Sequence, residues 1–595
     1  MTCEEMIYSN EYSDYMINFF EGVEESGDLY RDGCVNPIIE RIAILHNPRP
    51  EDYLTNLERI PYSFIPKVFG LMDSSNLEAI GVKRVKNSEI LTDGGKNVMI
   101  GVIDTGIDYT NPLFLDELGN TRINVIWDQT IYGFDKSEGN DKNDNGNSTI
   151  NKSPNVSNDA GRINEYEIPI PLYGTFFSSE EINEALRLEN PFKMVPSRDE
   201  NGHGTFMAGI AAGGRDELGD FEGVASEAEL AVVKLKEVKP YLREYFGIPQ
   251  DVPAYSETDI IYAIEYLLRF ADARNMPISI LIGVGSSNGG HMGLTFIERY
   301  LTTILENPGV MVSVPAGNEG SERLHYAGQM DEGSNELEVE FNVAEGQNTL
   351  VLEFWGNAPT TFGIGLVSPQ GDRIERIPPR FGREEVVRLP LTDTTIYVAY
   401  QMVETFTGDE FIFVRLTKAT PGLWRLLVYA DDERKRSFNI WMPLRQFLQE
   451  NTYFLQGNPE NTITIPGNAP LVTTMTAYNH LNGSIYANAS RGFVNRSIAK
   501  PDLTAPGVNV MGPGLRKNYI RGTGTSVAAA HAAGIYALFL QWNLENPEFG
   551  VFYAAQIQSF FFKSAQRDAN QEYPNVVWGY GIIDAAQVFE QFRIV

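Results

Sequence analysis

The hydrophobic and polar positions change their pattern along the 595-residue chain. From about residue 95, apolar runs of strand length alternate with glycine-containing turns and with longer amphipathic or apolar stretches of helical length. The segments of both kinds are, in chain order, NVMIGVIDTG, AELAVVKLK, DIIYAIEYLLRFADAR, MPISILIGVG, FIERYLTTILEN and GVMVSVPAGNEG. Alternation of this kind predicts an α/β fold in which βαβ units build a parallel sheet.

A second pattern occupies residues 335–450, where the helical stretches stop. Eight strand-like runs follow one another, separated by turn residues: NELEVEFNVA, NTLVLEFWG, TFGIGLVSPQG, EVVRLPL, TTIYVAYQM, EFIFVRLTK, GLWRLLVYA and SFNIWMP. They predict a β-sandwich or jelly roll inserted into the α/β domain. The α/β pattern then resumes over residues 451–595 and ends in a helix at DAAQVFEQF.

The N-terminal residues 1–73 form a third pattern. A strand-like run, IERIAILHNP (40–49), precedes a helix-like stretch, RPEDYLTNLERI (49–60). We expect a small α+β unit here. The chain thus divides into residues 1–73, a first α/β part over 74–334, the inserted sandwich over 335–450, and a second α/β part over 451–595.

Composition and charge exclude several classes of protein. The 43% apolar residues are ample for large cores, so the chain is globular. With 79 Asp and Glu against 47 Lys and Arg, the formal net charge is -32, and a nucleic-acid partner is not expected. The two cysteines, Cys3 and Cys34, both lie near the N-terminus, so no disulfide framework supports the bulk of the chain.

Neither a secretion signal nor a membrane span is expected. The opening MTCEEMIYSNEYSDYM is acidic and lacks both a basic region and an apolar core. The most apolar stretch, VAAAHAAGIYALFLQW (527–542), is shorter than the roughly 20 residues of a membrane span and predicts a buried core helix. We expect a protein that stays inside the cell or leaves it without an ordinary signal.

A polar stretch, DKSEGNDKNDNGNSTINKS (135–153), imitates the opening of an EF-hand loop with Asp141, Asn143, Asn145 and Gly146. Its twelfth position is Lys152, where a calcium loop needs a bidentate glutamate. The sequence therefore favours a solvated loop, and no metal or cofactor is expected.

Three short stretches carry candidate chemistry. Asp104 ends the apolar run VMIGVIDTGID, at the edge of a parallel sheet where ligands bind. His203 lies in NGHGTFMAGIAAGG, and Ser526 in RGTGTSVAAAHAAG, where a turn of small residues precedes an apolar helix. Taken singly, each has a simpler interpretation: a turn aspartate, a histidine at a helix start, and a helix N-cap. An aspartic protease would need a second D-T-G triplet, which the chain lacks.

Taken together, Asp104, His203 and Ser526 occur in the order, and within the local sequence motifs, of the subtilisin-like serine proteases, which the chain resembles. Asn318 in VPAGNEG matches the oxyanion asparagine of that family. The likeness extends to SRGFVNRSIAKPDLTAPGVNV (490–510) and WGYGIIDAAQVF (578–589), so it covers nearly the whole α/β part. The resemblance implies a subtilisin-like fold and a serine endopeptidase.

The resemblance also implies a role for each site residue. His203 is the base that takes the Ser526 proton, Asp104 orients His203, and Asn318 with the Ser526 N–H binds the oxyanion. The stretch ISILIGVGSSNGGHMG (278–293) aligns with the strand that pairs with substrate, at Gly283, Val284 and Gly285. Gly283 departs from the serine that the family commonly has there. His531, in the same helix as Ser526, is expected to be structural.

A second departure is at the floor of the primary specificity pocket. The stretch TIPGNAP (464–470) aligns with this floor and places Thr464 where the family often has a glycine. The resemblance therefore implies a shallower and partly polar pocket.

The finer resemblance is to the clostridial Csp-type germination proteases. It rests on the acidic N-terminus with YSDYMINF, the insert LKEVKPYLREYFGIPQDVPAYSETDI (235–260), and the position of the jelly roll. It implies that residues 1–73 are a prodomain that stays bound after self-cleavage within Leu71 to Ser75. It also implies that the substrate is the zymogen of a spore cortex hydrolase, and that the protein is cytoplasmic or packaged in the spore.

Two alternatives remain open. One is an intracellular subtilase of broad specificity, and the other is a catalytically silent pseudoprotease that acts as a binding or sensing protein. The complete set of Asp104, His203, Ser526 and Asn318 argues against the second. We expect a monomer whose partners are a protein substrate and its own prodomain, and we expect the sandwich to act as a clamp on the catalytic domain.

Overall fold

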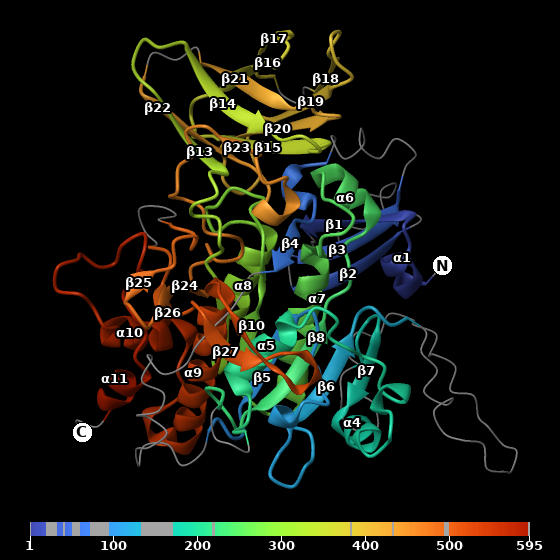
Figure 1. Ribbon diagram of the computed structural model, residues 1–595, viewed down its shortest axis with the longest axis vertical. Coiled ribbons are helices and arrows are strands. Elements are labelled where there is room, and N and C mark those ends of the chain that lie inside the picture. The colour runs from blue at the N-terminus through green and yellow to red at the C-terminus, as the bar shows by residue number, and fades with distance from the viewer. Residues whose placement is uncertain are drawn as a thin grey trace, which may run out of the picture.

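The computed structural model in Figure 1 describes most of the chain. The described residues are 2–18, 33–39, 42–49, 60–71, 94–132, 170–216, 221–380, 384–430, 434–492 and 499–592. The EF-hand-like stretch 135–153 lies outside them, and so do all but the two ends of the helix-like stretch 49–60.

The centre of the protein is a sheet in the order β25-β24-β12-β10-β5-β8-β6-β7, with β26 beside β24. The strands β24, β12, β10, β5, β8 and β6 run parallel. In the order of the chain, the strands are β5 (Met99–Asp104), β6 (Ile123–Asp128), β7 (Thr175–Ser178), β8 (Glu229–Lys234), β10 (Ile278–Ile282), β12 (Val310–Pro315), β24 (Thr473–Asn479), β25 (Ser484–Ile485) and β26 (Leu503–Pro506).

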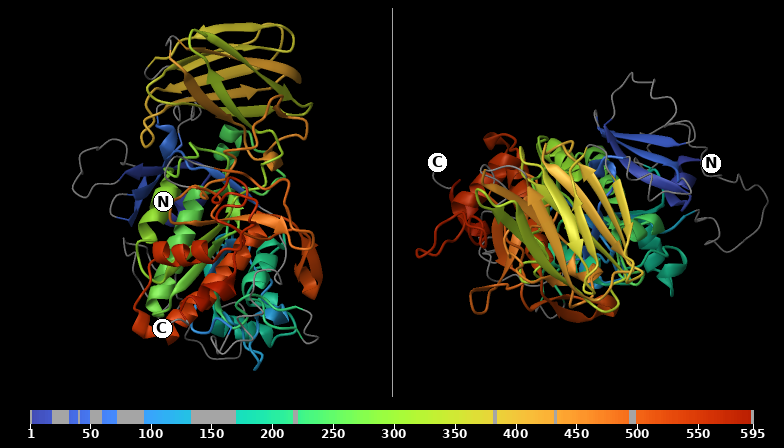
Figure 2. Two further views of the ribbon diagram at one scale, coloured as in Figure 1. Left: turned by 90° about the vertical axis from the view of Figure 1, so that its left-hand side faces the viewer. Right: turned by 90° about the horizontal axis from the view of Figure 1, so that it is seen from above.

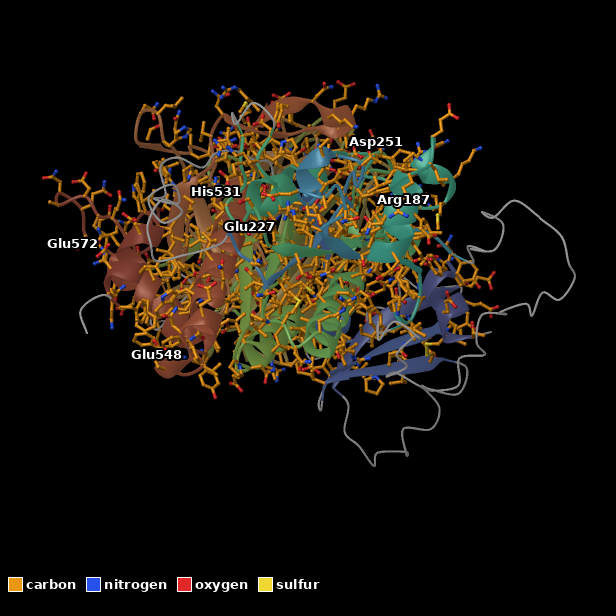
Figure 3. The ribbon with its side chains drawn as sticks, turned by 90° about the horizontal axis from the view of Figure 1, so that it is seen from below. Arg187, Glu227, Asp251, His531, Glu548 and Glu572 are labelled. Carbon is orange, nitrogen blue, oxygen red and sulfur yellow. A yellow bond between two sulfur atoms is a disulfide. The ribbon has the colours of Figure 1, made fainter. Side chains whose placement is uncertain are left out.

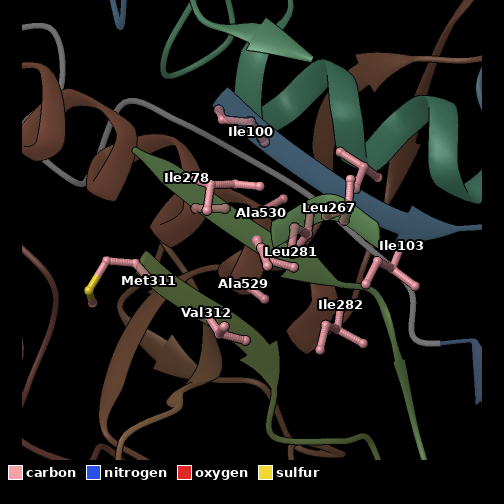
Figure 4. Packing of buried hydrophobic residues seen from close by; sticks show 14 of the residues in the cluster. Ile100, Ile103, Leu267, Ile278, Leu281, Ile282, Met311, Val312, Ala529 and Ala530 are labelled. Atoms are coloured by element: carbon pink, nitrogen blue, oxygen red, sulfur yellow. The ribbon is translucent and has the colours of Figure 1, made fainter. Parts of the chain in front are cut away.

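Helices cover both faces of this sheet, which is why its central strands β5, β8, β10 and β12 are mainly apolar runs without polar alternation. A Cβ atom placed on Gly101 of β5 would lie 2.9 Å from Leu267 of helix α7 (Glu257–Ala273). On the opposite face, Ser279 of β10 donates to the carbonyl of Ala533 in helix α9 (Thr525–Glu545), at 2.8 Å. Figure 4 shows the core that results, with Leu267 and Ala530 among the packed residues.

The other helices are shorter than α7 and α9. They are α1 (Cys3–Tyr8), α4 (Ser179–Leu186), α5 (His203–Ala212), α6 (Pro240–Phe246), α8 (Phe296–Ile304), α10 (Ala554–Ser564) and α11 (Ala585–Glu590). Every residue of α5 is buried, because it packs against α9 and β5 inside the α/β domain. No helix of the described ranges is long and apolar enough to cross a membrane.

A β-sandwich lies at the top of Figure 1, at one end of the molecule. One sheet has the order β13-β22-β15-β20-β19-β18 and the other β17-β16-β21-β14-β23. The strands are β13 (His325–Met330), β14 (Glu336–Val343), β15 (Thr349–Gly356), β16 (Phe362–Val367), β17 (Arg373–Ile377), β18 (Glu384–Arg388), β19 (Thr395–Gln401), β20 (Glu410–Thr417), β21 (Gly422–Ala430), β22 (Arg436–Trp441) and β23 (Tyr453–Phe454).

The sandwich is larger than the eight predicted runs. The strands β13 and β23 lie outside residues 335–450, and β17 lies inside that range without having been predicted. These three strands border the two sheets, where half-exposed sequences such as HYAGQM and RIERI carry a weak apolar signal. The predicted fold class, α/β with an inserted β-sandwich, is confirmed.

The N-terminal unit is a small sheet in the order β1-β3-β2 with helix α1 beside it. Its strands are β1 (Tyr12–Asn18), β2 (Cys34–Ile39) and β3 (Ile42–Pro48), and the Cys3–Cys34 disulfide joins α1 to β2. A further strand, β4 (Val68–Leu71), leaves this unit and pairs with β9 (Tyr255–Ser256) and β11 (Val284–Gly285) of the α/β domain. The views in Figure 2 show the unit at one side of the molecule, beside the α/β domain and below the level of the sandwich.

One hydrophobic cluster joins all three parts of the chain. It contains Tyr15 of the N-terminal unit, Tyr245 of α6 and Phe413 of the sandwich, and the last two rings stack at 4.8 Å. Beside it, the buried Glu353 carboxylate of β15 accepts hydrogen bonds from the Tyr62 hydroxyl, from Asn288 Nδ2 at 2.7 Å and from the Gly289 N–H at 2.8 Å. Each part therefore contacts the other two.

Candidate active site

Three elements of the α/β domain end or begin at the same edge of the central sheet. Asp104 is the last residue of β5, His203 is the first residue of α5, and Ser526 is the second residue of α9. The carboxyl ends of parallel strands and the N-termini of the following helices meet at one edge, so these side chains converge although they are far apart in the sequence.

The three side chains form a hydrogen-bonded line. His203 Nδ1 lies 2.7 Å from Asp104 Oδ1 and 2.9 Å from its Oδ2, and His203 Nε2 lies 3.4 Å from Ser526 Oγ. Asp104 and Ser526 are fully buried, and His203 is 9% exposed. An imidazole between a carboxylate and a hydroxyl can take the hydroxyl proton while the carboxylate stabilises the resulting cation.

A second carboxylate, Asp199, holds the Asp104–His203 pair in place. Its Oδ1 accepts from the Thr105 hydroxyl at 2.8 Å and from the N–H groups of Asn201 and Gly202. Its Oδ2 accepts from the N–H and the hydroxyl of Thr205, at 2.9 and 2.7 Å. Asp199 therefore ties the turn after β5 to the start of α5.

Sequence reasoning did not identify Asp199. Its only signal was its position four residues before His203, in RDENGHGT. The hydrogen bonds that give it a role come from Thr105 and Thr205 as well as from its immediate neighbours.

The glycines at this edge are places where no side chain fits. A Cβ atom on Gly204 would overlap the Gly106 carbonyl and lie 3.2 Å from Asp104 Cβ. A Cβ atom on Gly283 would overlap Asp104 Oδ2 and lie 3.2 Å from His203 Cε1. The glycine at 283, a departure from the resembled family, thus lies directly against the carboxylate–imidazole pair.

Asn318 follows β12 and lies beside the start of α9. Its side-chain oxygen accepts from the N–H and from the hydroxyl of Thr525, both at 3.2 Å, and the Gly317 N–H donates to the same hydroxyl at 3.0 Å. The amide is therefore oriented by the residue that precedes Ser526. The structure brings Asn318 to the site together with the other three predicted residues.

The strand predicted to pair with substrate, β11, is paired with another strand of the same chain, β4. In β11, Val284 pairs with Leu71 and Gly285 pairs with Gly70 of β4 in antiparallel register. On its other side β4 pairs with β9, where Val68 faces Ser256 and Phe69 faces Tyr255. A peptide in the β4 position is thus held by main-chain pairing on both edges. The strand β4 ends at Leu71, which pairs with Val284, the residue after Gly283.

Thr464 is fully buried beside this strand. Its hydroxyl donates to the Ala316 carbonyl at 3.3 Å. Cβ atoms placed on Gly285 and Gly317 would lie 2.7 and 2.9 Å from Thr464 Oγ1, and Ile465 pairs with Ser286. Thr464 therefore packs between β11 and the loop that carries Asn318.

The buried titratable groups around the site have shifted pKa values. Burial raises the pKa of the Glu319 carboxyl, next to Asn318, to about 7, and this carboxylate accepts the Arg445 N–H at 3.0 Å. Burial lowers the pKa of His531 to about 3, and its Nδ1–H donates to the Val527 carbonyl at 2.7 Å. His531 is fully buried, and in the view of Figure 3 it lies away from Glu548 and Glu572. His531 is therefore a neutral residue within α9.

The described residues contain no group of three or more His, Cys, Asp and Glu side chains that could hold a metal ion. The chemistry that the described site offers is that of a serine hydroxyl, an imidazole and a carboxylate.

Comparison with known proteins shows the family to which the chain belongs. Residues 95–374 and 449–581 match the model of the subtilase family, peptidase family S8. The structure is similar to that of the Clostridium perfringens CspB protease, with a TM-score of 0.73 and 26% sequence identity, covering 87% of this chain and 98% of that chain. It is also similar to the prenylagaramide maturation protease PagA, with a TM-score of 0.40 and 12% identity over 86% and 97% of the two chains. No curated protein matches the sequence.

Proposed function

The chain belongs to the subtilase family of serine peptidases, and from this premise we propose that Ser526 is its nucleophile, His203 its general base and Asp104 the residue that orients the imidazole. The observation that carries the proposal is the line from Asp104 through His203 to Ser526, with contacts of 2.7 and 3.4 Å. In this role, the Ser526 oxygen attacks a peptide carbonyl while His203 Nε2 takes its proton. The same proton then passes to the leaving amine.

Asn318 and the Ser526 N–H bind the oxyanion in this proposal. The hydrogen bonds from Thr525 to Asn318 Oδ1 preorganise the amide, and a donor that is already oriented needs no reorganisation in the transition state. Ser526 also lies in the first turn of α9, where the helix dipole favours developing negative charge.

We further propose that β4 marks the path of the substrate and that residues 1–73 are a prodomain cut from the chain by its own active site. The register supports this, because Leu71 faces Val284, and the residue directly before β11 is Gly283, which lies against Asp104 and His203. The proposed bond is Met72–Asp73, within the predicted interval from Leu71 to Ser75. Residues 72–93, which include this bond, lie outside the described residues. Tethering makes such a cut efficient because proximity replaces a bimolecular encounter.

The prodomain is proposed to stay bound after the cut. The support is a buried polar interface that does not depend on the Met72–Asp73 bond. Lys239 donates to Asp14 at 2.7 Å, Tyr262 Oη lies 3.0 Å from His46 Nε2, and the Lys67 N–H donates to Glu257 at 2.8 Å. These contacts join the N-terminal unit to the segment 235–262.

The natural substrate proposed here is the zymogen of a spore cortex hydrolase. Its support is the similarity to the CspB protease over 87% of this chain and 98% of that chain, a coverage too large for the sandwich to lie wholly outside the match. A peptidase of broad specificity is the competing proposal, and a silent binding protein is a third. The buried and complete hydrogen-bonded line favours an active enzyme over the third.

Intact mass spectrometry of the full chain tests the proposed function. The wild type is expected to give two co-purifying fragments, whereas Ser526→Ala stays a single 66.5 kDa chain. A cut in Ser526→Ala would show that another protease makes it. Incubation of the enzyme with a purified cortex-hydrolase zymogen and with casein then separates the two substrate proposals, since a broad peptidase degrades both.

A further inference from the structure

Gly70, the third residue of β4, lies against a turn that the chain forms between β22 and β23. A Cβ atom placed on Gly70 would overlap Nε2 of Gln446, and it would lie 2.7 Å from Gln446 Cδ and 3.2 Å from Leu444 Cδ1. We call Leu444 and Gln446 the roof residues. Val68 and Phe69, the two preceding residues of the same strand, are fully buried.

The backbone does not require a glycine at position 70. Gly70 lies in the extended strand β4, paired with Gly285, and its φ is outside the left-handed region. Any L-residue adopts this conformation without strain. Space under the roof residues is therefore the reason why a side chain does not fit.

The roof is anchored at several points. Arg445–Phe447 form a single 3-10 turn, closed by the bond from the Phe447 N–H to the Leu444 carbonyl at 2.9 Å. Leu444 and Phe447 are buried, and Arg445 donates its N–H to Glu319 at 3.0 Å and Nη1 to the Thr452 carbonyl at 2.9 Å. Leu444 is therefore held by the packing around it, whereas the end of the partly buried Gln446 side chain can rotate away.

We propose that Leu444 and Gln446 are specificity-determining residues that restrict the substrate residue opposite Gly285 to glycine. The inference rests on the proposed function, in which β4 marks the substrate path. It assigns the substrate class as extended peptides with a large apolar residue, then glycine, then leucine, as in Phe69, Gly70 and Leu71. Alanine is accepted only when Gln446 moves, and a β-branched residue would crowd Leu444 more than alanine does.

Quenched peptides based on residues 67–74, Lys-Val-Phe-X-Leu-Met-Asp-Ser, test the proposal with the full-length enzyme. The measured quantity is the ratio of kcat/KM between peptides with X as Gly, Ala or Val. In the full-length enzyme β4 itself can occupy the cleft, and this lowers the rate with every peptide by the same factor. That factor cancels when the rates of two peptides on the same enzyme are divided. We expect Gly over Ala by about tenfold and Gly over Val by about a hundredfold, since overpacking a filled site has costs of this order.

The variants separate the roof from other causes. Gln446→Ala is expected to bring the Gly-to-Ala ratio below about threefold and to keep the preference over Val, because Leu444 remains. Gln449→Ala, an exposed glutamine of the same segment, is the matched control and should leave both ratios unchanged. In the chain itself, Gly70→Ala should slow self-cleavage about tenfold, and Gln446→Ala should restore it.

Two outcomes would overturn the proposal. The first is a wild-type enzyme that cleaves the Gly and Ala peptides at equal rates, and the second is a Gly-to-Ala ratio that Gln446→Ala leaves unchanged. Either result removes the specificity role and leaves the proposed peptidase standing. A wild type that cleaves no peptide and stays one chain would instead overturn the proposed function, and this inference with it.

Discussion

The ammonium of Lys239 lies 2.7 Å from the carboxylate of Asp14, and both side chains are buried where the N-terminal unit meets the α/β domain. His46 shares the same carboxylate oxygen through Nδ1 at 2.6 Å. Burial alone would raise the pKa of Asp14, but Lys239 and His46 hold this pKa well below its ordinary value. The pair therefore favours the docked N-terminal unit as long as Asp14 is ionised.

Breaking this pair should release the N-terminal unit. Lys239→Met leaves a buried carboxylate without its cation, and the loss of one partner of a buried pair costs about 3–5 kcal/mol. We expect the two fragments of the processed enzyme to separate on size exclusion, where the wild-type fragments elute together. Asp393→Asn, which breaks the exposed pair of Arg388 and Asp393, is the control and should change nothing. Retention of the unit in Lys239→Met would show that the interface does not depend on the pair.

The same pair sets a pH dependence. Because the pKa of Asp14 is lowered in the folded state, its contribution is present above the unfolded value of about 3.9 and is lost as the pH falls below it. Co-elution of the fragments should therefore persist at pH 5 to 7 and weaken below about pH 4.

Substitutions in the proposed triad should abolish hydrolysis. Ser526→Ala or His203→Ala is expected to lower kcat/KM by about 10⁴-fold or more, since the triad acts as a unit. Asn318→Ala removes one oxyanion donor and should cost about 10²- to 10³-fold. Steady-state hydrolysis of a peptide substrate measures all three, and Ser559→Ala on the exposed side of α10 is the control. Activity of Ser526→Ala within tenfold of the wild type would refute the assignment.

Asp199 should behave as a positioning residue. Asp199→Asn exchanges one acceptor oxygen for a donor facing the Thr205 N–H and hydroxyl or the N–H groups of Asn201 and Gly202. An unsatisfied buried group costs about 1–3 kcal/mol, so we expect kcat to fall about tenfold to a hundredfold with little change in KM. The pH–rate profile is the second readout, because a displaced imidazole shifts its acid limb. A variant that is less stable but keeps kcat and the profile would show a purely structural role.

Glu353 should act as the clamp between the three parts of the chain. Glu353→Ala leaves buried donors on Tyr62, Asn288 and Gly289 without their acceptor, at about 1–3 kcal/mol each. We expect a lower midpoint of urea unfolding and looser retention of the N-terminal unit. Glu336→Ala, exposed on the same sandwich, is the control. Loss of acyl-enzyme formation with an unchanged midpoint would contradict the clamp.

The buried carboxyl of Glu410 should make the stability of the sandwich depend on pH. Burial raises the pKa of its carboxyl to about 8, and its Oε2 accepts the Phe362 N–H. Between about pH 4.3 and 8 the folded state then binds more protons than the unfolded state, so stability falls as the pH rises, by up to about 1.4 kcal/mol per pH unit. Glu410→Gln should flatten this dependence in unfolding curves at pH 5, 6, 7 and 8, and Glu384→Gln, which is exposed, should not. Equal slopes in Glu410→Gln and the wild type would refute the assignment.

Local patterns in the sequence determined the elements and the candidate chemistry. The run before Asp104, the small residues around Ser526 and the glycines beside His203 report burial, helix starts and close approach within a few residues. These signals predict an α/β fold with an inserted sandwich, because periodicity reflects which face of a strand or helix is buried. Thus Asp104, His203 and Ser526 were candidates before their distances were known, and the family resemblance added Asn318.

Only the tertiary structure decided which distant residues meet. Gln446 fills the place of a side chain on Gly70, Lys239 pairs with Asp14, and Thr105 donates to Asp199. In each pair the residues lie far apart in the sequence, and neither has a neighbour in sequence that signals its partner. The edge strands β13, β17 and β23 also depend on tertiary structure, since pairing across a sheet stabilises them more than their own apolar pattern does. Hydrophobic patterning is a local property, whereas the contacts that orient a catalytic group or close a subsite depend on how the whole chain packs.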